Sequence, residues 1–270
     1  MAKAKGEAYI IAGGTDLLVR MKSGMIDPDL VVDIKRIPAM QSIDKTGSGF
    51  KIGAAVPCVQ LSGNKALAKA WPGVVEAAQL IGSDQVQGRC TMAGNLCNAS
   101  PAADSVPALV AARAKAVMVG PKGRRTMPVE KVVTGPGSTA LKKGEVIEAL
   151  TLPKQEARSG DAYLRFIPRT EMDIAVCSAG VNLTLGANGV VKKARVALGA
   201  VGPTVVVVPA AARALVGSKL DDAALAKVAK ACEAACAPID DKRGTIEFRT
   251  EVAGVLACRA AKIAYERAGG

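Results

Sequence analysis

Residues 10–18 read IIAGGTDLL, a short apolar run that stops at two glycines and resumes with the spacing of a helix. A strand that ends in glycines just before a helix leaves backbone N–H groups at the positive end of the helix dipole. Such a turn can hold a pyrophosphate, because glycine has no Cβ to obstruct the phosphate oxygens. Taken alone, however, this pattern is more often a tight turn without a ligand. A Rossmann or P-loop domain has no support, since neither a G-x-G-x-x-G nor a Walker A motif is present.

Residues 91–104, TMAGNLCNASPAAD, form a second stretch of small polar residues around a glycine. Its hydroxyls, amides and single carboxylate suit hydrogen bonds to phosphate oxygens and ribose hydroxyls, and it contains no pair of nucleophile and base. The stretch lies within residues 82–107, which are rich in glycine and proline and show little periodicity. We expect this longer segment to lack regular structure, and such segments inside compact domains are more often functional than idle. A structural loop that satisfies its own polar groups is the open alternative.

The composition limits the possible chemistry, because the 270 residues include no histidine. The length is roughly twice that of the commonest domain, so one large or two modest domains fit. Without histidine, a Ser-His-Asp triad, a Cys-His dyad and a His-ligated zinc or haem site are excluded. Any reactivity must come from carboxylates, thiols, amines, hydroxyls or a cofactor.

The chain carries a net charge of +12, from 36 basic and 24 acidic residues. The basic residues are scattered and only 3% of residues are aromatic, which is unlike proteins that stack nucleic-acid bases. The charge therefore indicates a solvated surface with some bias toward anionic ligands or an acidic partner. We expect no nucleic-acid binding and, since no apolar stretch is long enough, no membrane span.

The seven cysteines are odd in number, form no C-x-x-C pair and follow an N-terminus without a visible signal peptide. These features are typical of reduced thiols, so we expect a cytoplasmic protein. Cys232 and Cys236 lie one helical turn apart, but no second pair accompanies them. Helix packing explains these two thiols better than a metal site does.

The second half of the chain follows a different pattern. Residues 176–185 alternate in polarity, an Asn-Gly turn follows, and residues 190–198 run back, which predicts a β-hairpin. Helical spacing predicts two helices, over residues 221–237 and 245–267. A turn-rich stretch around residues 154–160 is a plausible domain boundary.

The two glycine-bearing segments together resemble the FAD-binding medium subunit of molybdenum hydroxylases, the family of xanthine dehydrogenase and carbon monoxide dehydrogenase. The motif AGGTDLL at residues 12–18 is followed about 75 residues later by the segment 91–104. The second half agrees, with RTEMDIA at residues 169–175 and DKRGTIEFR at residues 241–249. The resemblance covers nearly the whole chain in the same order.

This resemblance implies an α+β fold with two domains. Residues 1–157 would form a two-lobed FAD-binding domain of the vanillyl-alcohol oxidase type. Residues 158–270 would form a smaller domain of antiparallel sheet plus helices, as in the flavoproteins of molybdenum hydroxylases.

The resemblance also implies which residues contact FAD, and it assigns no catalytic residue and no metal ligand to this chain. Backbone amides and two threonine hydroxyls of the glycine-bearing segments would hold the pyrophosphate. Asn98 and Asp104 would contact the pyrophosphate and ribose, two isoleucines would pack against FAD, and Arg165 would touch it. The full set is Ile10, Ile11, Ala12, Gly13, Gly14, Thr15, Asp16, Leu17, Ile81, Thr91, Met92, Ala93, Gly94, Asn95, Asn98, Asp104, Ile147 and Arg165.

The chain departs from the family pattern in two places. Only eleven residues precede Ala12, so part of the first lobe is expected to be missing or supplied otherwise. Ala93 replaces the first glycine of the usual T-x-G-G-N motif, which should leave the backbone there less free. The four-cysteine insertion that adds an iron–sulfur cluster in one branch is absent, so FAD should be the only redox group on this chain.

Three functions remain open at this point. The resemblance implies an FAD-carrying electron-transfer subunit that works between [2Fe-2S] clusters of a small subunit and an external carrier such as NAD. A large subunit would hold the molybdopterin cofactor, and the assembly would be a dimer of heterotrimers. One alternative is a stand-alone flavin oxidoreductase of the vanillyl-alcohol oxidase type. Another is a basic binding module without enzymatic activity, which only the net charge favours.

Overall fold

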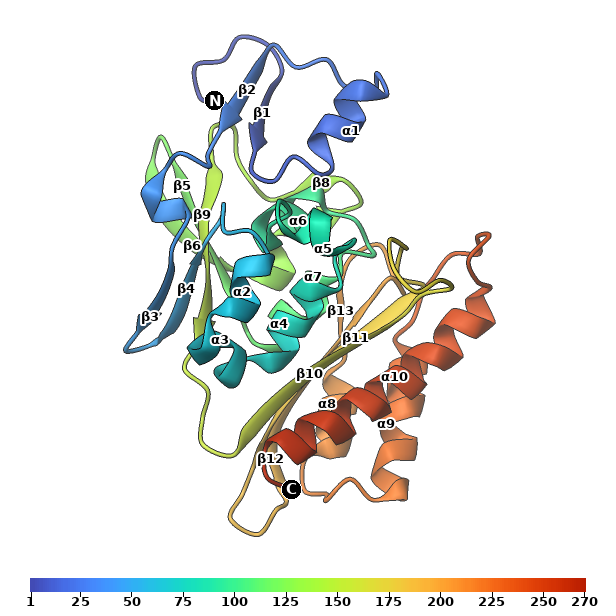
Figure 1. Ribbon diagram of the computed structural model, residues 1–270. Helices are drawn as coiled ribbons and strands as arrows, with labels where there is room; N and C mark the ends of the chain where they lie inside the picture. The colour runs from blue at the N-terminus through green and yellow to red at the C-terminus, as the bar shows by residue number, and fades with distance from the viewer.

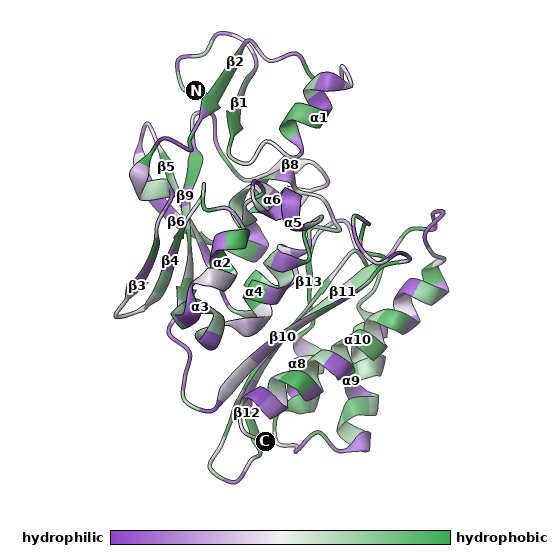
Figure 2. Ribbon diagram, viewed as in Figure 1, coloured by the Kyte–Doolittle hydropathy of each residue, from purple (hydrophilic) through white to green (hydrophobic).

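The computed structural model describes all 270 residues, and it begins with a small β–α–β unit (Figure 1). Strand β1 (Ala8–Ile11) stops before the two glycines, and helix α1 (Leu17–Lys22) follows them, as the sequence predicts. Strand β2 (Leu30–Asp33) pairs with β1 in parallel. Figure 2 shows that both strands are largely hydrophobic, yet no residue of either is fully buried. The unit is therefore a thin layer at one end of the molecule.

An antiparallel sheet of five strands follows, in the order β3-β4-β9-β5-β6. The hairpin β3–β4 precedes the helices, whereas β5, β6 and β9 come after them. Their bounds are β3 Ile43–Thr46, β4 Gly49–Gly53, β5 Lys115–Gly120, β6 Gly123–Pro128 and β9 Val146–Pro153. Short 3-10 turns (Pro38–Met40 and Val129–Lys131) and the two-stranded ribbon β7 (Val133–Gly135) and β8 (Ser138–Thr139) complete this half.

Six short helices connect β4 to β5. They are α2 Val59–Gly63, α3 Lys65–Ala70, α4 Pro72–Gln79, α5 Asp84–Gln87, α6 Met92–Asn98 and α7 Ser105–Ala111. The expectation that residues 82–107 lack regular structure is therefore wrong. Each helix there is four to seven residues long, too short to produce a visible periodicity in the sequence. Among these three helices only α6 has a side-chain cap, the Thr91 hydroxyl that accepts the Gly94 N–H at 2.9 Å.

The second half is a four-stranded antiparallel sheet in sequence order, β10 to β13, followed by three helices. The predicted hairpin and both predicted helices are confirmed. The bounds are β10 Ser159–Phe166, β11 Cys177–Leu185, β12 Val191–Gly199, β13 Val206–Val207, α8 Pro209–Leu215, α9 Asp222–Ala234 and α10 Ile246–Arg267. Helix α10 lies along β10 and β11 (Figure 1), and Thr245 caps its first turn by accepting the Phe248 N–H at 3.2 Å.

Two hydrophobic cores correspond to the two halves. A cluster of 35 buried residues fills the first half, and a cluster of 22 lies between the second sheet and its helices. Helix α7 packs on β11 and β12, the opposite side of that sheet from α10. Gly180 permits this contact, because a Cβ there would lie 2.6 Å from the carbonyl oxygen of Pro107. The halves are thus packed closely against each other.

Charged groups also join the halves. Asp161, at the start of β10, accepts the N–H of Val74 at 3.1 Å and so caps the first turn of α4. Burial raises the pKa of Asp161 to about 7, and one carboxylate oxygen is buried without a partner. Arg267 of α10 pairs with Glu76 of α4. No helix is long and apolar enough to cross a bilayer.

Candidate functional site

A cavity of about 450 Å³ lies between the β1–α1–β2 unit, helix α6 and strand β9. It brings together most of the residues that the sequence assigned to FAD. Those that line it are Ile10, Ile11, Ala12, Gly13, Gly14, Thr15, Asp16, Leu17, Ile81, Thr91, Ala93, Gly94, Asn95, Asn98 and Ile147. The two glycine-bearing segments, about 75 residues apart in the chain, thus face one space.

The turn of residues 13–16, here called the cradle, offers four consecutive backbone N–H groups without a hydrogen-bond partner in the chain. Helix α1 begins just after it, and Asp16 at the N-cap makes no side-chain capping bond. Lys35 donates to the Ala12 carbonyl oxygen at 2.9 Å and also pairs with Asp33 at 2.9 Å. The Ala12 carbonyl oxygen, just before the cradle, therefore has a positively charged hydrogen-bond donor. The four N–H groups of the cradle remain available to a ligand. This donor set fits an anionic diphosphate.

The glycines of the cradle are required for a different reason from the one the sequence indicated. A Cβ on Gly13 would lie 2.1 Å from the carbonyl oxygen of Arg89, and Gly14 adopts φ +79°. A Cβ on Gly14 would meet Ile11 and Leu18 at 3.1 Å rather than the cavity. Glycine therefore allows the loop to pack against residues 89–90 and to adopt a left-handed turn.

Helix α6 contributes the second wall of the cavity. The Thr91 hydroxyl oxygen accepts the Gly94 N–H, which leaves its proton free to donate. Ala93 lies in the first turn of α6 without a positive φ, so the helix accommodates alanine where the family pattern has glycine. Asn98 donates to Asp16 at 3.1 Å and so links α6 to the start of α1. Burial raises the pKa of Asp16, while Thr15 and Arg20 oppose that rise.

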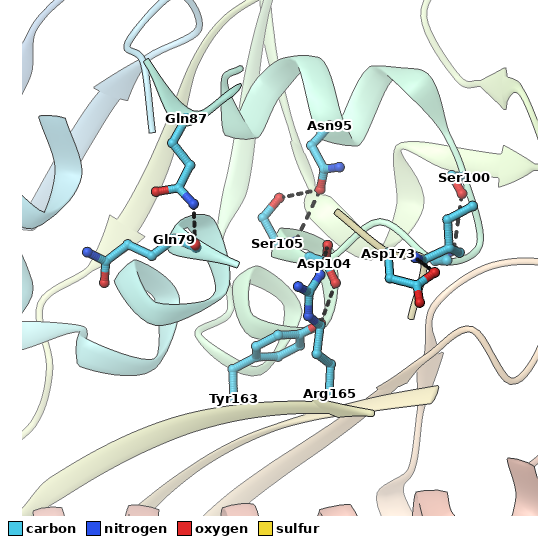
Figure 3. Close-up of polar contacts among 11 residues, drawn as sticks. Gln79, Gln87, Asn95, Ser100, Asp104, Ser105, Tyr163, Arg165 and Asp173 are labelled. Atoms are coloured by element: carbon cyan, nitrogen blue, oxygen red, sulfur yellow. Dashed lines mark hydrogen bonds and ion pairs between the residues drawn. The ribbon is translucent and has the colours of Figure 1, made fainter. Parts of the chain in front are cut away.

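Three predicted residues do not line this cavity. Met92 is 2% exposed and belongs to the first core. Asp104 accepts from the Tyr163 hydroxyl at 3.2 Å and pairs with Arg165 at 2.7 Å (Figure 3). Burial raises the pKa of Asp104 even though Arg165 and the hydrogen bonds lower it. The Arg165 Nε is buried without a partner. These two charges lie at the contact between α7 and β10.

Sequence reasoning missed part of the cavity wall. Tyr9 and Arg20 line it and stack, with the guanidinium carbon 5.9 Å from the ring centroid. The polarity pattern of β1 could have indicated Tyr9. Leu141 and Glu145 also line the cavity, and hydrogen bonds from Arg125 and from the Lys142 N–H lower the pKa of Glu145 to about 2. Nothing in the local sequence marks these residues, and Glu145 is held in place by Arg125 of β6, 20 residues away in the chain.

A second cavity of about 290 Å³ lies where the loop after α6 meets the second half. Its lining includes Ile174 and Arg243, from the two second-half segments that carried the family resemblance. Arg249 also lines it, pairs with Asp241 at 2.6 Å and donates to the Val176 carbonyl at 2.6 Å. The two segments therefore meet in space and are fixed to each other.

Two family models match the chain. One describes the FAD-binding domain in molybdopterin dehydrogenase and matches residues 1–155. The other describes the C-terminal domain of the CO dehydrogenase flavoprotein and matches residues 162–264. Together they cover most of both halves.

Individual relatives agree in sequence. The carbon monoxide dehydrogenase medium chain of Hydrogenophaga pseudoflava is 32% identical over 261 residues, which is 97% of this chain and 90% of the relative. The xanthine dehydrogenase FAD-binding subunit of Escherichia coli O157:H7 is 27% identical over 98% of this chain and 91% of the relative.

Solved structures agree in fold. A chain of the reconstituted CO dehydrogenase from Oligotropha carboxidovorans matches with a TM-score of 0.92 and 33% identity, over 97% of this chain and 91% of that chain. A chain of quinoline 2-oxidoreductase from Pseudomonas putida 86 matches with a TM-score of 0.88 and 25% identity, over 97% and 90% of the two chains.

Proposed function

The chain belongs to the family of FAD-binding subunits of molybdopterin dehydrogenases, and from this we propose that it is the electron-transfer subunit of such an assembly. It passes electrons between [2Fe-2S] clusters of a small subunit and an external carrier such as NAD. A large subunit holds the molybdopterin cofactor and oxidises or reduces the organic or gaseous substrate. The three subunits form a heterotrimer, and two heterotrimers form a dimer. The medium chains and FAD subunits among the relatives support this role.

The observation that carries the proposal is the cradle, with four free amides at the edge of a cavity lined by the predicted residues. These amides bind the pyrophosphate, and the Thr15 and Thr91 hydroxyls add donors. Lys35 contributes a positive charge beside the cradle. Bound FAD supplies a centre that accepts and donates electrons. The remaining work of this chain is to hold and orient that group, and no acid–base step on the substrate is assigned to its residues.

The same proposal includes the division of the chain into two domains and the cellular compartment of the protein. Residues 1–157 form the FAD-binding domain, in two lobes of the vanillyl-alcohol oxidase type, and residues 158–270 form the C-terminal domain. The separate cores and the gap between the two family models, at residues 156–161, support that boundary. Seven unpaired cysteines suit a reducing compartment, the cytoplasm.

Purification from the native host tests the proposal. A tag on this chain should recover a complex with flavin, iron and molybdenum. Carbon monoxide, xanthine and quinoline, after which the relatives above are named, form the first substrate panel. We expect substrate to reduce the flavin only in the complete complex. Substrate-dependent flavin reduction by the purified chain alone would contradict the relay role and favour a stand-alone flavin oxidoreductase.

A further inference from the structure

The side chain of Asn95 ends in an amide, and this residue lines the FAD cavity beside Gly94. An asparagine amide has a donor, its NH2 group, and an acceptor, its oxygen. Whether it attracts or repels a ligand depends on which of the two faces the site. An oxygen directed at a phosphate would repel it, whereas the NH2 group would donate to it. The orientation is decided by the partners that the protein supplies.

Ser105 supplies two of those partners. Its backbone N–H donates to Asn95 Oδ1 at 3.1 Å, and its hydroxyl donates to the same oxygen at 2.7 Å. A backbone N–H can only donate, so the atom that it contacts must be the amide oxygen. Ser105 is fully buried at the start of α7, where the core holds it in place.

The opposite side of the amide is left free. Asn95 Nδ2 makes no hydrogen bond within the chain. Figure 3 shows the nitrogen on the side of the amide away from Ser105. Asn95 is only partly buried, as a residue at the wall of a cavity should be. The free donor therefore belongs to the cavity rather than to the core.

We infer that Ser105 is a positioning residue that presents the Asn95 NH2 group as a donor to the diphosphate of FAD. The inference rests on the FAD site proposed above. Ser105 does not line the cavity and touches no ligand, so its effect on FAD must pass through Asn95. Asp104, its neighbour in the sequence, accepts hydrogen bonds from Tyr163 and Arg165 and makes none with Asn95.

Fluorescence titration of the apoprotein with FAD tests this inference, because Kd can be measured without partner subunits or turnover. Ser105→Ala removes the hydroxyl but keeps the backbone donor. We expect Kd to rise about 3- to 10-fold, the range of one hydrogen bond. Ser105→Thr keeps the hydroxyl and should stay within about twofold of the wild type. Ser159→Ala, which removes the contact to Thr184 at 2.7 Å in the second sheet, is the matched control and should not change Kd.

A double-mutant cycle separates positioning from general packing. In an Asn95→Ala background, Ser105→Ala should change Kd by less than about twofold, because no amide remains to be oriented. An equal loss in both backgrounds would overturn the inference, and so would an unchanged Kd in the single Ser105→Ala variant. Equal losses for the Ala and Thr variants would also overturn it, since packing rather than the hydroxyl would then be responsible. If Ser105→Ala lowers the Tm, the Thr variant and the cycle still decide.

Discussion

Polar groups lack partners in the cradle, whereas most of them are paired at the contact between α7, α4 and β10. The cradle leaves four amides without partners and places a lysine beside them. At the contact, Asp104 pairs with Arg165, and Asp161 caps α4, with both carboxylates buried. Unpaired N–H donors at a cavity contribute binding energy only when a ligand is bound. Buried charges affect the stability of the fold whether or not a ligand is present. Changes in the cradle should therefore alter FAD affinity, and changes at the contact should alter stability.

Arg165→Met should have the largest effect, on stability. It removes one partner of a buried ion pair and leaves the Asp104 carboxylate with Tyr163 alone. We expect a loss of about 3 kcal/mol or more in the free energy of unfolding of the apoprotein, measured with urea. Arg169→Met is the control, because its side chain is 69% exposed and should cost under about 0.5 kcal/mol.

The same variant decides how Arg165 relates to FAD. If Arg165→Met kept its stability but lost FAD affinity, the residue would contact FAD, as the family resemblance implies. The distinction between cradle and contact would then fail at this position.

Gly14→Val should have the next largest effect, on binding. Its φ of +79° is strained for a β-branched residue, and the added side chain would push against Ile11 and Leu18 and displace the amides. We expect FAD Kd to rise about 100-fold, equivalent to ~2.7 kcal/mol, in a chain that remains folded. Gly24→Val is the matched control, since φ is +69° there and no atom lies within 4 Å of its Cβ. It should share the backbone strain and keep its affinity for FAD.

Asp161→Asn should change the pH dependence of stability. The folded protein holds this proton up to about pH 7, whereas the unfolded chain releases it near the ordinary pKa of 3.8. The unfolded state thus binds fewer protons between these values, and stability falls as pH rises through the window. Asparagine can still accept the Val74 N–H. We expect this variant to gain about 2 kcal/mol over the wild type at pH 8 relative to about pH 5.5, by urea unfolding at both pH values.

A constant difference between Asp161→Asn and the wild type across that range would contradict the assignment of the proton to Asp161. Glu76 and Arg267 also face this carboxyl, the first raising its pKa and the second lowering it. Glu76→Gln should accordingly narrow the pH-dependent difference without abolishing it.

Lys35→Met should have the smallest effect. The loss of its bond to the Ala12 carbonyl and of its charge should raise FAD Kd about fivefold. Because the lysine is partly exposed, the difference should shrink as salt is added. Lys45→Met, on the exposed strand β3, is the control. A salt-independent loss of affinity would indicate that Lys35 acts through loop geometry alone.

The sequence predicted contiguous features well. The turn at residues 10–17 depends on local order, so the strand, the glycines and the helix could be predicted together. The hairpin between β11 and β12 and the helices α9 and α10 were predicted from periodicity for the same reason. The short helices within residues 82–107 were missed, because they are too short to show a periodicity and are held mainly by packing.

Features that depend on contacts between residues far apart in the sequence could not be predicted. Lys35 reaches the Ala12 carbonyl because β1 and β2 run in parallel and bring it alongside the turn. Glu145 lines the cavity and is held in place by Arg125 of β6, 20 residues away in the chain. Ser105 lies just after the segment 91–104, and only the folded chain shows its two hydrogen bonds to Asn95.

The most direct test is the flavin content of the apoprotein after reconstitution with FAD. We expect one FAD per chain, held by the cradle without a covalent bond. No histidine exists to form one. Acid precipitation of the reconstituted protein should release all of the flavin into the supernatant. A chain that binds no FAD would contradict the proposed FAD site, and a pellet that stays yellow would contradict non-covalent binding.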